Sequence, residues 1–334
     1  MAWTPELLHG VCINGCAEID DAGRARLAAA KESAVPLSLL WNNRGEMPVV
    51  RWDRELLDWI EERAGVLDAV RRSGSDVNFW TAFRALSGRD RASDILAWNQ
   101  GSIPSCCLTA TSHAIQAATL IAAQLGAPVR YDAINPIYAH YVSLGGVMSS
   151  GQDCVTAGTF VNEKGVYPVA AVGKNNLSTP TDFRQFEAVA RENRVAVAFV
   201  PDPDPDTVFL LARAGLPFVF GSAQFCTAAE RDRNGIAVGR AWTSGAHAEM
   251  GAGGYCRAED GTEYAYVQNS HGDGYETDAT GHTPSGYWLT RDGWSRLTST
   301  MSRYGDPFVV FPRAEISDRL TFVPIGLDRK ERRA

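Results

Sequence analysis

The length, composition and charge of the chain indicate a folded protein and exclude several classes of partner. It has 334 residues, 45% of them hydrophobic and 21% charged, enough apolar surface for two lobes or for a catalytic domain with an additional segment. The net charge of −7, without any Lys/Arg cluster, argues against nucleic acid or a membrane surface as partner. We find no signal peptide and no apolar run approaching the ~20 residues of a membrane span, so we expect a soluble protein, cytoplasmic or within a particle or assembly.

The first 95 residues read as an N-terminal extension with elements of its own. A short alanine-rich helix is expected over 19–31, and loop with short extended pieces over 35–52. Asp53 is a plausible N-cap for a longer helix that places Leu56, Ile60 and Leu67 on one face. Another helical piece follows at 79–86. We expect this extension to be an integral subdomain, a docking arm for a protein partner, or a prosegment.

The stretch 99–107 reads Asn-Gln-Gly-Ser-Ile-Pro-Ser-Cys-Cys and precedes a long apolar-periodic run that Gly126 and Pro128 end. Cys106 therefore stands at a predicted helix start. The unpaired N–H groups and the dipole of a helix N-terminus lower the pKa of a thiol there and raise its thiolate fraction. Cys106 is thus a candidate nucleophile that needs a base from elsewhere in the chain.

Helices come first in the remaining sequence and strands later. Helical pieces are expected over 131–142, 156–164 and 180–193, and a helix capped by Asp206 reaches Ala214. Strand patterns cover 195–200, 217–222, 246–256, 263–269, 287–290 and 308–311. This segregation predicts an α+β protein with a helical lobe over about 96–194, a β lobe over about 195–334, and a cleft between them.

The seven cysteines are an odd number in a large chain, unlike a secreted disulfide scaffold. At least one thiol must be free. Cys12 and Cys16 are four residues apart and could form half of a metal site, but no His/Cys pair with ligand spacing completes it. Buried or idle thiols are the preferred interpretation, and we expect no metal and no cofactor.

Among the six histidines, His247 is the best candidate base for Cys106. His113 lies two turns further along the same predicted helix, so the two side chains cannot meet, and we expect a packed or surface residue. His247 opens a small-residue strand pattern, and the next strand ends at Asn269. The amide oxygen of Asn269 can hold one imidazole nitrogen so that the other faces the thiol.

Three motifs together resemble the papain-like cysteine peptidases in order, residue type and separation. They are Gln100-Gly-Ser leading to Cys106, His247-Ala with a following Gly-Tyr, and Asn269-Ser with spaced glycines. The separations are close to the ~130–150 residues between Cys and His or Asn in that family. The resemblance covers about residues 96–312. It implies a papain-like two-lobed fold, a helical lobe beside an antiparallel β-barrel-like lobe.

By this resemblance Cys106 is the nucleophile of a peptidase, His247 its partner in a thiolate–imidazolium pair, and Asn269 the residue that orients the imidazole. Gln100 would join the Cys106 N–H in an oxyanion hole, a contribution of ~3 kcal/mol to the barrier. The substrate would be a peptide or protein.

The sequence also departs from the family pattern. Ile103 stands where the family has a disulfide-forming cysteine, and Cys107 replaces a tryptophan; we interpret Cys107 as core filler rather than a reactive thiol. His271 replaces a tryptophan that shields the Asn–His hydrogen bond, so we expect a weaker shield. The stretch 149–152 does not match the paired glycines that bind the substrate backbone.

Two other functions remain open. The same triad attacks any amide, so an amidase, deamidase or acyl transferase on the same fold is one alternative. The other is a non-catalytic structural or binding module, for instance in a phage particle or bacterial assembly. The intact set Gln100, Cys106, His247 and Asn269 argues against the second, because a binding module does not need all four.

Overall fold

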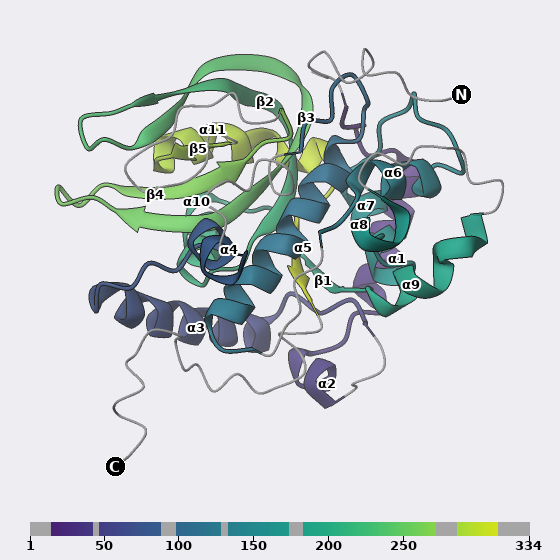
Figure 1. Cartoon of the computed structure of the whole chain (residues 1–334), viewed down its shortest axis with the longest axis horizontal. Coiled ribbons are helices and arrows are strands. Elements are labelled where there is room, and N and C mark those ends of the chain that lie inside the picture. Colours follow the sequence, from purple (N-terminus) through teal and green to yellow (C-terminus); the bar gives the residue numbers. More distant parts are fainter. Residues whose placement is uncertain are drawn as a thin grey trace.

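A computed structural model describes residues 15–42, 47–87, 98–127, 133–173, 183–271 and 286–312. The order of elements confirms the α+β prediction, with a helical part preceding an antiparallel sheet (Figure 1). The helices are α1 (Asp21–Glu32), α2 (Leu37–Asn42), α3 (Arg54–Arg72), α4 (Phe79–Ser87), α5 (Cys106–Gln124), α6 (Pro136–Ser143), α7 (Cys154–Glu163), α8 (Val169–Val172), α9 (Glu187–Glu192), α10 (Pro205–Arg213) and α11 (Arg291–Met301), with 3-10 turns η2 (Phe183–Phe186) and η3 (Ser302–Tyr304). The strands are β1 (Ala196–Phe199), β2 (Phe218–Arg231), β3 (Ala237–Arg257), β4 (Glu263–Gln268), β5 (Gly286–Leu289) and β6 (Phe308–Phe311).

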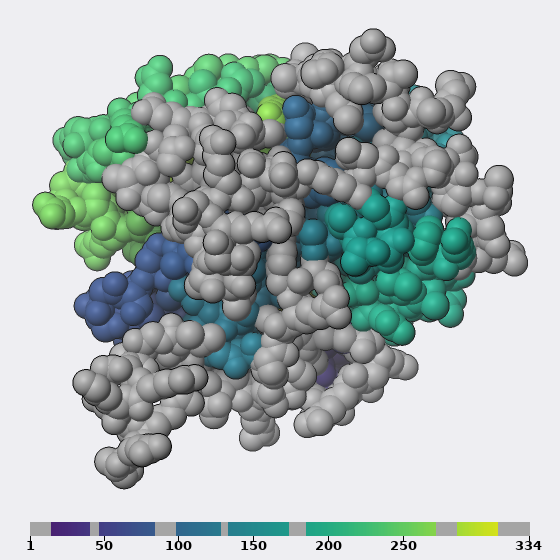
Figure 2. Space-filling view, in the orientation of Figure 1, coloured from purple at the N-terminus to yellow at the C-terminus, as the bar shows by residue number. Residues whose placement is uncertain are grey.

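The six strands form one sheet in the order β1-β6-β2-β3-β4-β5, and each neighbouring pair is antiparallel. Strand β3 also pairs in parallel with β5, through Val238 and Trp288. Because β3 contacts both β4 and β5, the sheet curls toward a barrel. On the face shown in Figure 2, the green strands and the teal residues around α9 form opposite sides of the molecule.

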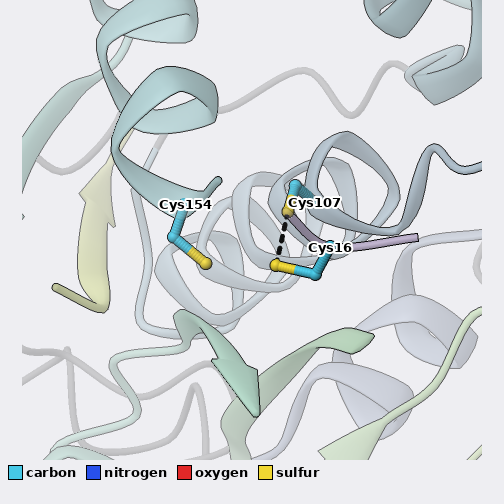
Figure 3. A group of neighbouring side chains, drawn as sticks. All are labelled: Cys16, Cys107 and Cys154. Atoms are coloured by element: carbon cyan, nitrogen blue, oxygen red, sulfur yellow. Dashed lines mark hydrogen bonds between the residues drawn. The ribbon is translucent and has the colours of Figure 1, made fainter. Parts of the chain in front are cut away.

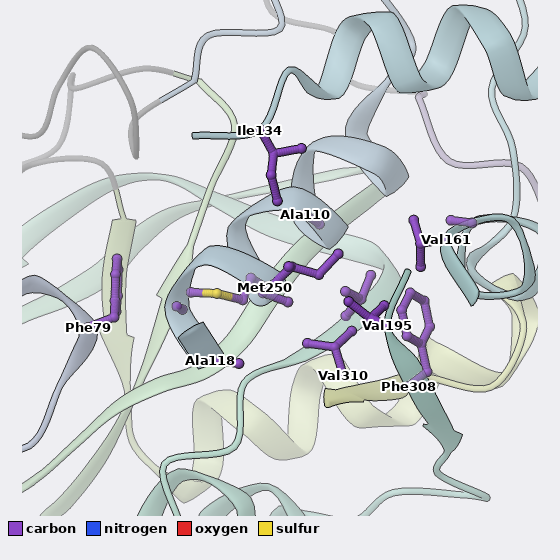
Figure 4. Close-up of a cluster of buried hydrophobic side chains, with 14 of the residues drawn as sticks. Phe79, Ala110, Ala118, Ile134, Val161, Val195, Met250, Phe308 and Val310 are labelled. Carbon is purple, nitrogen blue, oxygen red and sulfur yellow. The ribbon is translucent and has the colours of Figure 1, made fainter. Parts of the chain in front are cut away.

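Side chains from both faces of the sheet are buried, which explains why its short strands are apolar without interruption. In β6, Phe308 and Val310 join the core cluster that includes α5, while Val309 and Phe311 join a second cluster with α3, α10 and α11. This alternation is the period-2 geometry of a strand. Figure 4 shows the first cluster, in which Met250 of β3 lies among side chains from α5 and β6.

Helix α5 runs through the middle of the molecule (Figure 1) and contacts β2, β3, β6, α4, α6 and α7. Seventeen of its residues are buried. Its length and composition would suffice to cross a membrane, so the prediction that no segment is long and apolar enough is wrong. The helix is buried on all sides, as the central helix of a protein core is, whereas an amphipathic surface helix would expose one polar face.

The described part of the N-terminal extension packs closely against the rest of the chain. Helix α3 buries Leu56, Ile60 and Leu67 as its spacing predicted, and it contacts α10. Arg63 of α3 is fully buried, and its Nε donates to the carbonyl oxygen of Ala214 at 2.6 Å. Helix α1 contacts α7. The division into an extension and a main domain stays a prediction.

Several boundaries differ from the expected ones. Asp204, and not Asp206, caps α10: its side chain accepts from the N–H of Thr207 at 2.8 Å, and Pro205 occupies the first helical turn, where its fixed φ fits. Helix α2 lies in a stretch expected to be loop, and α11 was not anticipated. Strands β2 and β3 form a much longer hairpin than predicted. Cys12, His9 and His282 lie outside the described residues.

Candidate active site

Cys106 is the first residue of α5, as the sequence predicts. No side chain of the N-cap residue or of the first turn neutralises the positive end of this helix. The N-cap residue Ser105 makes no side-chain capping bond, and the first turn holds no acidic residue. By contrast, α7 is capped by Asp153, whose carboxylate accepts from the N–H of Thr156 at 2.9 Å. The free N–H groups and positive dipole end of α5 are therefore left to act on the Cys106 thiol.

His247 lies on β3 opposite Ser222 of β2, and Asn269 follows the end of β4. The Nε2 atom of His247 is 2.8 Å from Oδ1 of Asn269, which also accepts from the N–H of Ser270 at 2.6 Å. Since Oδ1 can only accept, Nε2 carries the proton. Nδ1 has no hydrogen-bond partner in the part of the chain that the structure describes, so it is the nitrogen that remains for Cys106.

The ionisation of Cys106 and His247 is coupled. Burial raises the pKa of Cys106, but the neighbouring thiols of Cys107 and Cys16 and the proximity of His247 outweigh it, so the net pKa is well below its usual value. Burial lowers the pKa of His247, but Cys106, Glu249 and Asn269 reverse this and raise it. Opposite shifts of this kind favour a thiolate–imidazolium pair.

Gln100 is attached to the same end of β4 as Asn269. Its backbone N–H donates to the carbonyl oxygen of Ser270 at 2.9 Å, and its side-chain Oε1 accepts from the Ser270 hydroxyl. The Nε2 group donates to the carbonyl oxygen of Ile103 at 2.9 Å. One of its two N–H bonds is therefore occupied, and the other has no partner among the described residues. The sequence did not identify Ser270 as the residue that orients this amide, although it lies inside the Asn269 motif.

Two rings cover the imidazole of His247. His271, at the position of the family's tryptophan, stacks on it with ring centroids 4.8 Å apart. Phe225 of β2 packs 4.6 Å from His247 and 5.6 Å from His271. Phe225 thus supplies an aromatic ring that the motif comparison did not reveal, because it lies on the unpredicted part of the hairpin.

A buried carboxyl group lies behind the imidazole. Glu249 is two residues after His247 on β3, is 1% exposed, and contacts the hydroxyl of Tyr287 at 2.8 and 2.9 Å. Burial raises its pKa to about 7, against the opposing effects of His247 and Tyr287. Because side chains two residues apart in a strand lie on the same face, Glu249 could have been placed beside His247 from the sequence alone.

The segment 15–17 lies across the site. The N–H of Cys16 donates to the carbonyl oxygen of Ala246, next to His247, and the N–H of Ala17 donates to Gln152, both at 3.1 Å. A Cβ on Gly151 would come within 2.3 Å of the Gly15 carbonyl oxygen, so the backbones touch. The stretch 149–152, which has no clean match to substrate-binding glycines, is thus contacted by the chain itself, and Cys106 is 0% exposed.

Three other thiols meet beside Cys106, and sequence reasoning missed their proximity. Cys16, Cys107 and Cys154 are all buried, and their sulfur atoms lie within 4.8 Å of one another (Figure 3). Cys107 Sγ is 3.3 Å from Cys16 Sγ and donates to the Gln152 carbonyl oxygen at 2.8 Å. No local spacing connects positions 16, 107 and 154. His113, in contrast, is packed as expected, and burial lowers its pKa to about 3.

Comparison with known proteins finds likeness at the level of structure. No family model and no curated protein matches the sequence. One matching solved structure is xylellain, a cysteine protease from Xylella fastidiosa, with 18% identity, a TM-score of 0.45, and coverage of 64% of this chain and 81% of that chain. Bromelain from Ananas comosus matches with 15% identity, a TM-score of 0.44, and coverage of 65% and 92%. Digestive procathepsin L 3 from Tenebrio molitor larval midgut matches with 12% identity, a TM-score of 0.46, and coverage of 89% and 82%. These are papain-like cysteine proteases, the family that the motifs resemble. At such identities and TM-scores, the likeness carries no argument about activity.

Proposed function

We propose that this chain is a thiol peptidase that hydrolyses peptide bonds through an acyl-enzyme on Cys106. One observation carries the proposal. The imidazole of His247 is fixed through Nε2 by Asn269 at 2.8 Å, which leaves Nδ1 for a thiol at the uncapped start of α5. A nucleophile, a base and an orienting group in this relation form the general arrangement of nucleophilic catalysis.

Each residue has a defined part in the proposed reaction. The Cys106 thiolate attacks the carbonyl carbon of a peptide bond, and the developing oxyanion is met by the backbone N–H of Cys106 and the free N–H of Gln100. Protonated His247 then gives its proton to the leaving amine, which leaves a thioester on Cys106. A water molecule, deprotonated by His247, attacks this thioester, which releases the acyl group as a carboxylic acid and restores the Cys106 thiolate beside protonated His247.

A second candidate is a non-catalytic binding module on the same fold. The complete burial of Cys106 and the position of segment 15–17 across the site favour it. Under the peptidase proposal the same features describe a closed resting state, in which segment 15–17 must move before a substrate reaches the thiol. The two proposals therefore differ in whether Cys106 ever becomes reactive.

Stoichiometric labelling with an epoxysuccinyl thiol-peptidase inhibitor at neutral pH, followed by peptide mass spectrometry, tests the proposal. We expect selective modification of Cys106, lost in Cys106→Ala and His247→Ala and retained in Cys107→Ala. The same labelling should be repeated after limited proteolysis at the exposed Glu18, on the C-terminal side of segment 15–17. Cleavage of a peptide library then defines the substrate.

The control thiol is Cys226, which is buried on β2, and whose pKa is raised by burial. If Cys106 reacts no faster than Cys226, both in the intact chain and after N-terminal proteolysis, the peptidase proposal is wrong and the binding module is favoured. Labelling that survives His247→Ala would equally contradict the thiolate–imidazolium pair.

A further inference from the structure

We propose that Cys16, Cys107 and Cys154 form a binding site for a single thiophilic d10 metal ion, Zn²⁺ or Cu⁺. The proposal does not depend on Cys106 being a nucleophile. It rests on the convergence of three sulfur atoms from distant parts of the chain, none of which reacts in a step of the proposed peptidase mechanism.

The geometry is close to that of a metal–thiolate site. All three sulfur atoms lie within 4.8 Å of one another, with Cys107 and Cys16 at 3.3 Å. Around a zinc ion with bonds of ~2.3 Å, tetrahedral sulfur ligands are about 3.8 Å apart. Small side-chain rotations therefore suffice to place the three sulfurs around one ion. Figure 3 shows that the side chains of Cys107 and Cys16 meet and that Cys154 lies beside them.

The surroundings favour a soft cation over water or a hard ion. Cys107 and Cys154 are 0% exposed and Cys16 is 4% exposed, so water is largely excluded. The ligands that meet here are thiols, and thiolates select Cu⁺ and Zn²⁺ over oxygen-seeking ions such as Mg²⁺. The Gln152 carbonyl oxygen, 2.8 Å from Cys107 Sγ, is a further possible ligand atom for Zn²⁺.

Two of the three proposed ligands are held by helices, and there is space for the third. Cys107 lies in the first turn of α5, and Cys154 is the first residue of α7, so the helix backbones fix the positions of both. Gly221 leaves space for the third, because a Cβ there would be 3.0 Å from Cys16 Sγ. When a metal ion binds, the thiols release their protons to solvent and the sulfurs become its ligands.

Occupation of the site would have a mechanical consequence. Cys16 belongs to the segment across the candidate active site, whereas Cys107 and Cys154 belong to α5 and α7. A metal ion bound by all three would fix segment 15–17 to both helices. Access to Cys106 would then depend on the metal, and this consequence rests on the proposed function.

Metal titration of the full chain, reduced and stripped of metal under anaerobic conditions, tests the site. Co²⁺ serves as the spectroscopic probe for Zn²⁺, and Cu⁺ is titrated against bicinchoninate. We expect one ion per chain and thiolate-to-cobalt charge-transfer absorption. Cys16→Ser, Cys107→Ser and Cys154→Ser should each weaken binding by at least about tenfold, while Cys226→Ser should leave it unchanged.

X-ray absorption of the metal-loaded wild-type chain needs no variant and decides the matter where a variant fails to fold. We expect three sulfur ligands at ~2.3 Å for Zn²⁺. The proposal is overturned if the folded chain binds neither ion, if the metal has only oxygen and nitrogen ligands, or if Cys106→Ala abolishes binding. A disulfide between Cys16 and Cys107 in freshly purified protein, before any reductant is added, would also overturn it. Failure of the inhibitor to label Cys106 in the metal-free chain, with metal binding intact, would refute only the proposed function.

Discussion

Replacing Glu249 by glutamine should change the pH dependence of stability in a defined direction. Burial raises the pKa of this carboxyl from its ordinary 4.5 to about 7 in the folded chain. Between these two values the folded chain keeps the proton and the unfolded chain releases it. The unfolded state therefore binds fewer protons, and the free energy of unfolding falls as the pH rises. A rise from 4.5 to about 7, at about 1.4 kcal/mol per pH unit, corresponds to about 3 kcal/mol.

Glutamine cannot ionise, and its side-chain oxygen can still accept from Tyr287. The stability of Glu249→Gln relative to wild type should therefore increase by about 3 kcal/mol between pH 4.5 and pH 8, with most of the change complete by pH 7. Urea denaturation at a series of pH values measures it. Glu192→Gln, an exposed carboxyl on α9, is the matched control and should show almost none of this change. A constant difference between Glu249→Gln and wild type across the series would refute the reasoning.

Other substitutions test further parts of the structure. Asn269→Ala removes the acceptor of His247 Nε2 and should slow inhibitor labelling of Cys106 about tenfold to a hundredfold. Thermal unfolding checks that the variant is folded, and an unchanged labelling rate would contradict the orienting role. Ile60→Ala on α3 should cost about 2–5 kcal/mol in the main urea transition if the N-terminal extension is an integral part of the fold, and a separate early transition would indicate a detachable segment. Gly65→Ala, where an added Cβ meets nothing within 4 Å, should stabilise the chain by up to about 1 kcal/mol, and destabilisation would contradict the described packing of α3.

The sequence predicted those features that depend on local chemistry. Helix α3 begins after Asp53, whose side chain accepts from the N–H of Leu56 at 3.2 Å, and α5 begins at Cys106 behind Pro104. Caps and helix-breaking residues act within a few positions, so their effect is readable from neighbouring letters. The apolar runs of β1 and β6 were also placed correctly. Both faces of these strands are buried, so their residues are apolar without interruption.

Features created by tertiary pairing were not readable in this way. The outer half of the β2–β3 hairpin alternates irregularly between buried and exposed residues and has an irregular register between Ser222 and Gln224. Its strands are defined by backbone pairing and not by an apolar pattern. The thiols of Cys16, Cys107 and Cys154 met only once α5, α7 and the N-terminal segment were placed. The motif spacing did bring Gln100, Cys106, His247 and Asn269 to one region, but their catalytic roles stay predictions.

Because Cys106 and His247 are far apart in the sequence, the ribosome synthesises them at different times. A ribosome adds about 5–20 residues per second from the N-terminus, so the imidazole is synthesised roughly 7–30 s after the thiol. During that interval His247 is absent from the nascent polypeptide, whereas Cys16 is already present. Strand β3 pairs with β2, β4 and β5, so His247 reaches its place only when the sheet closes. If the chain is the thiol peptidase proposed above, the growing polypeptide therefore cannot assemble its thiolate–imidazolium pair before most of its own fold is complete.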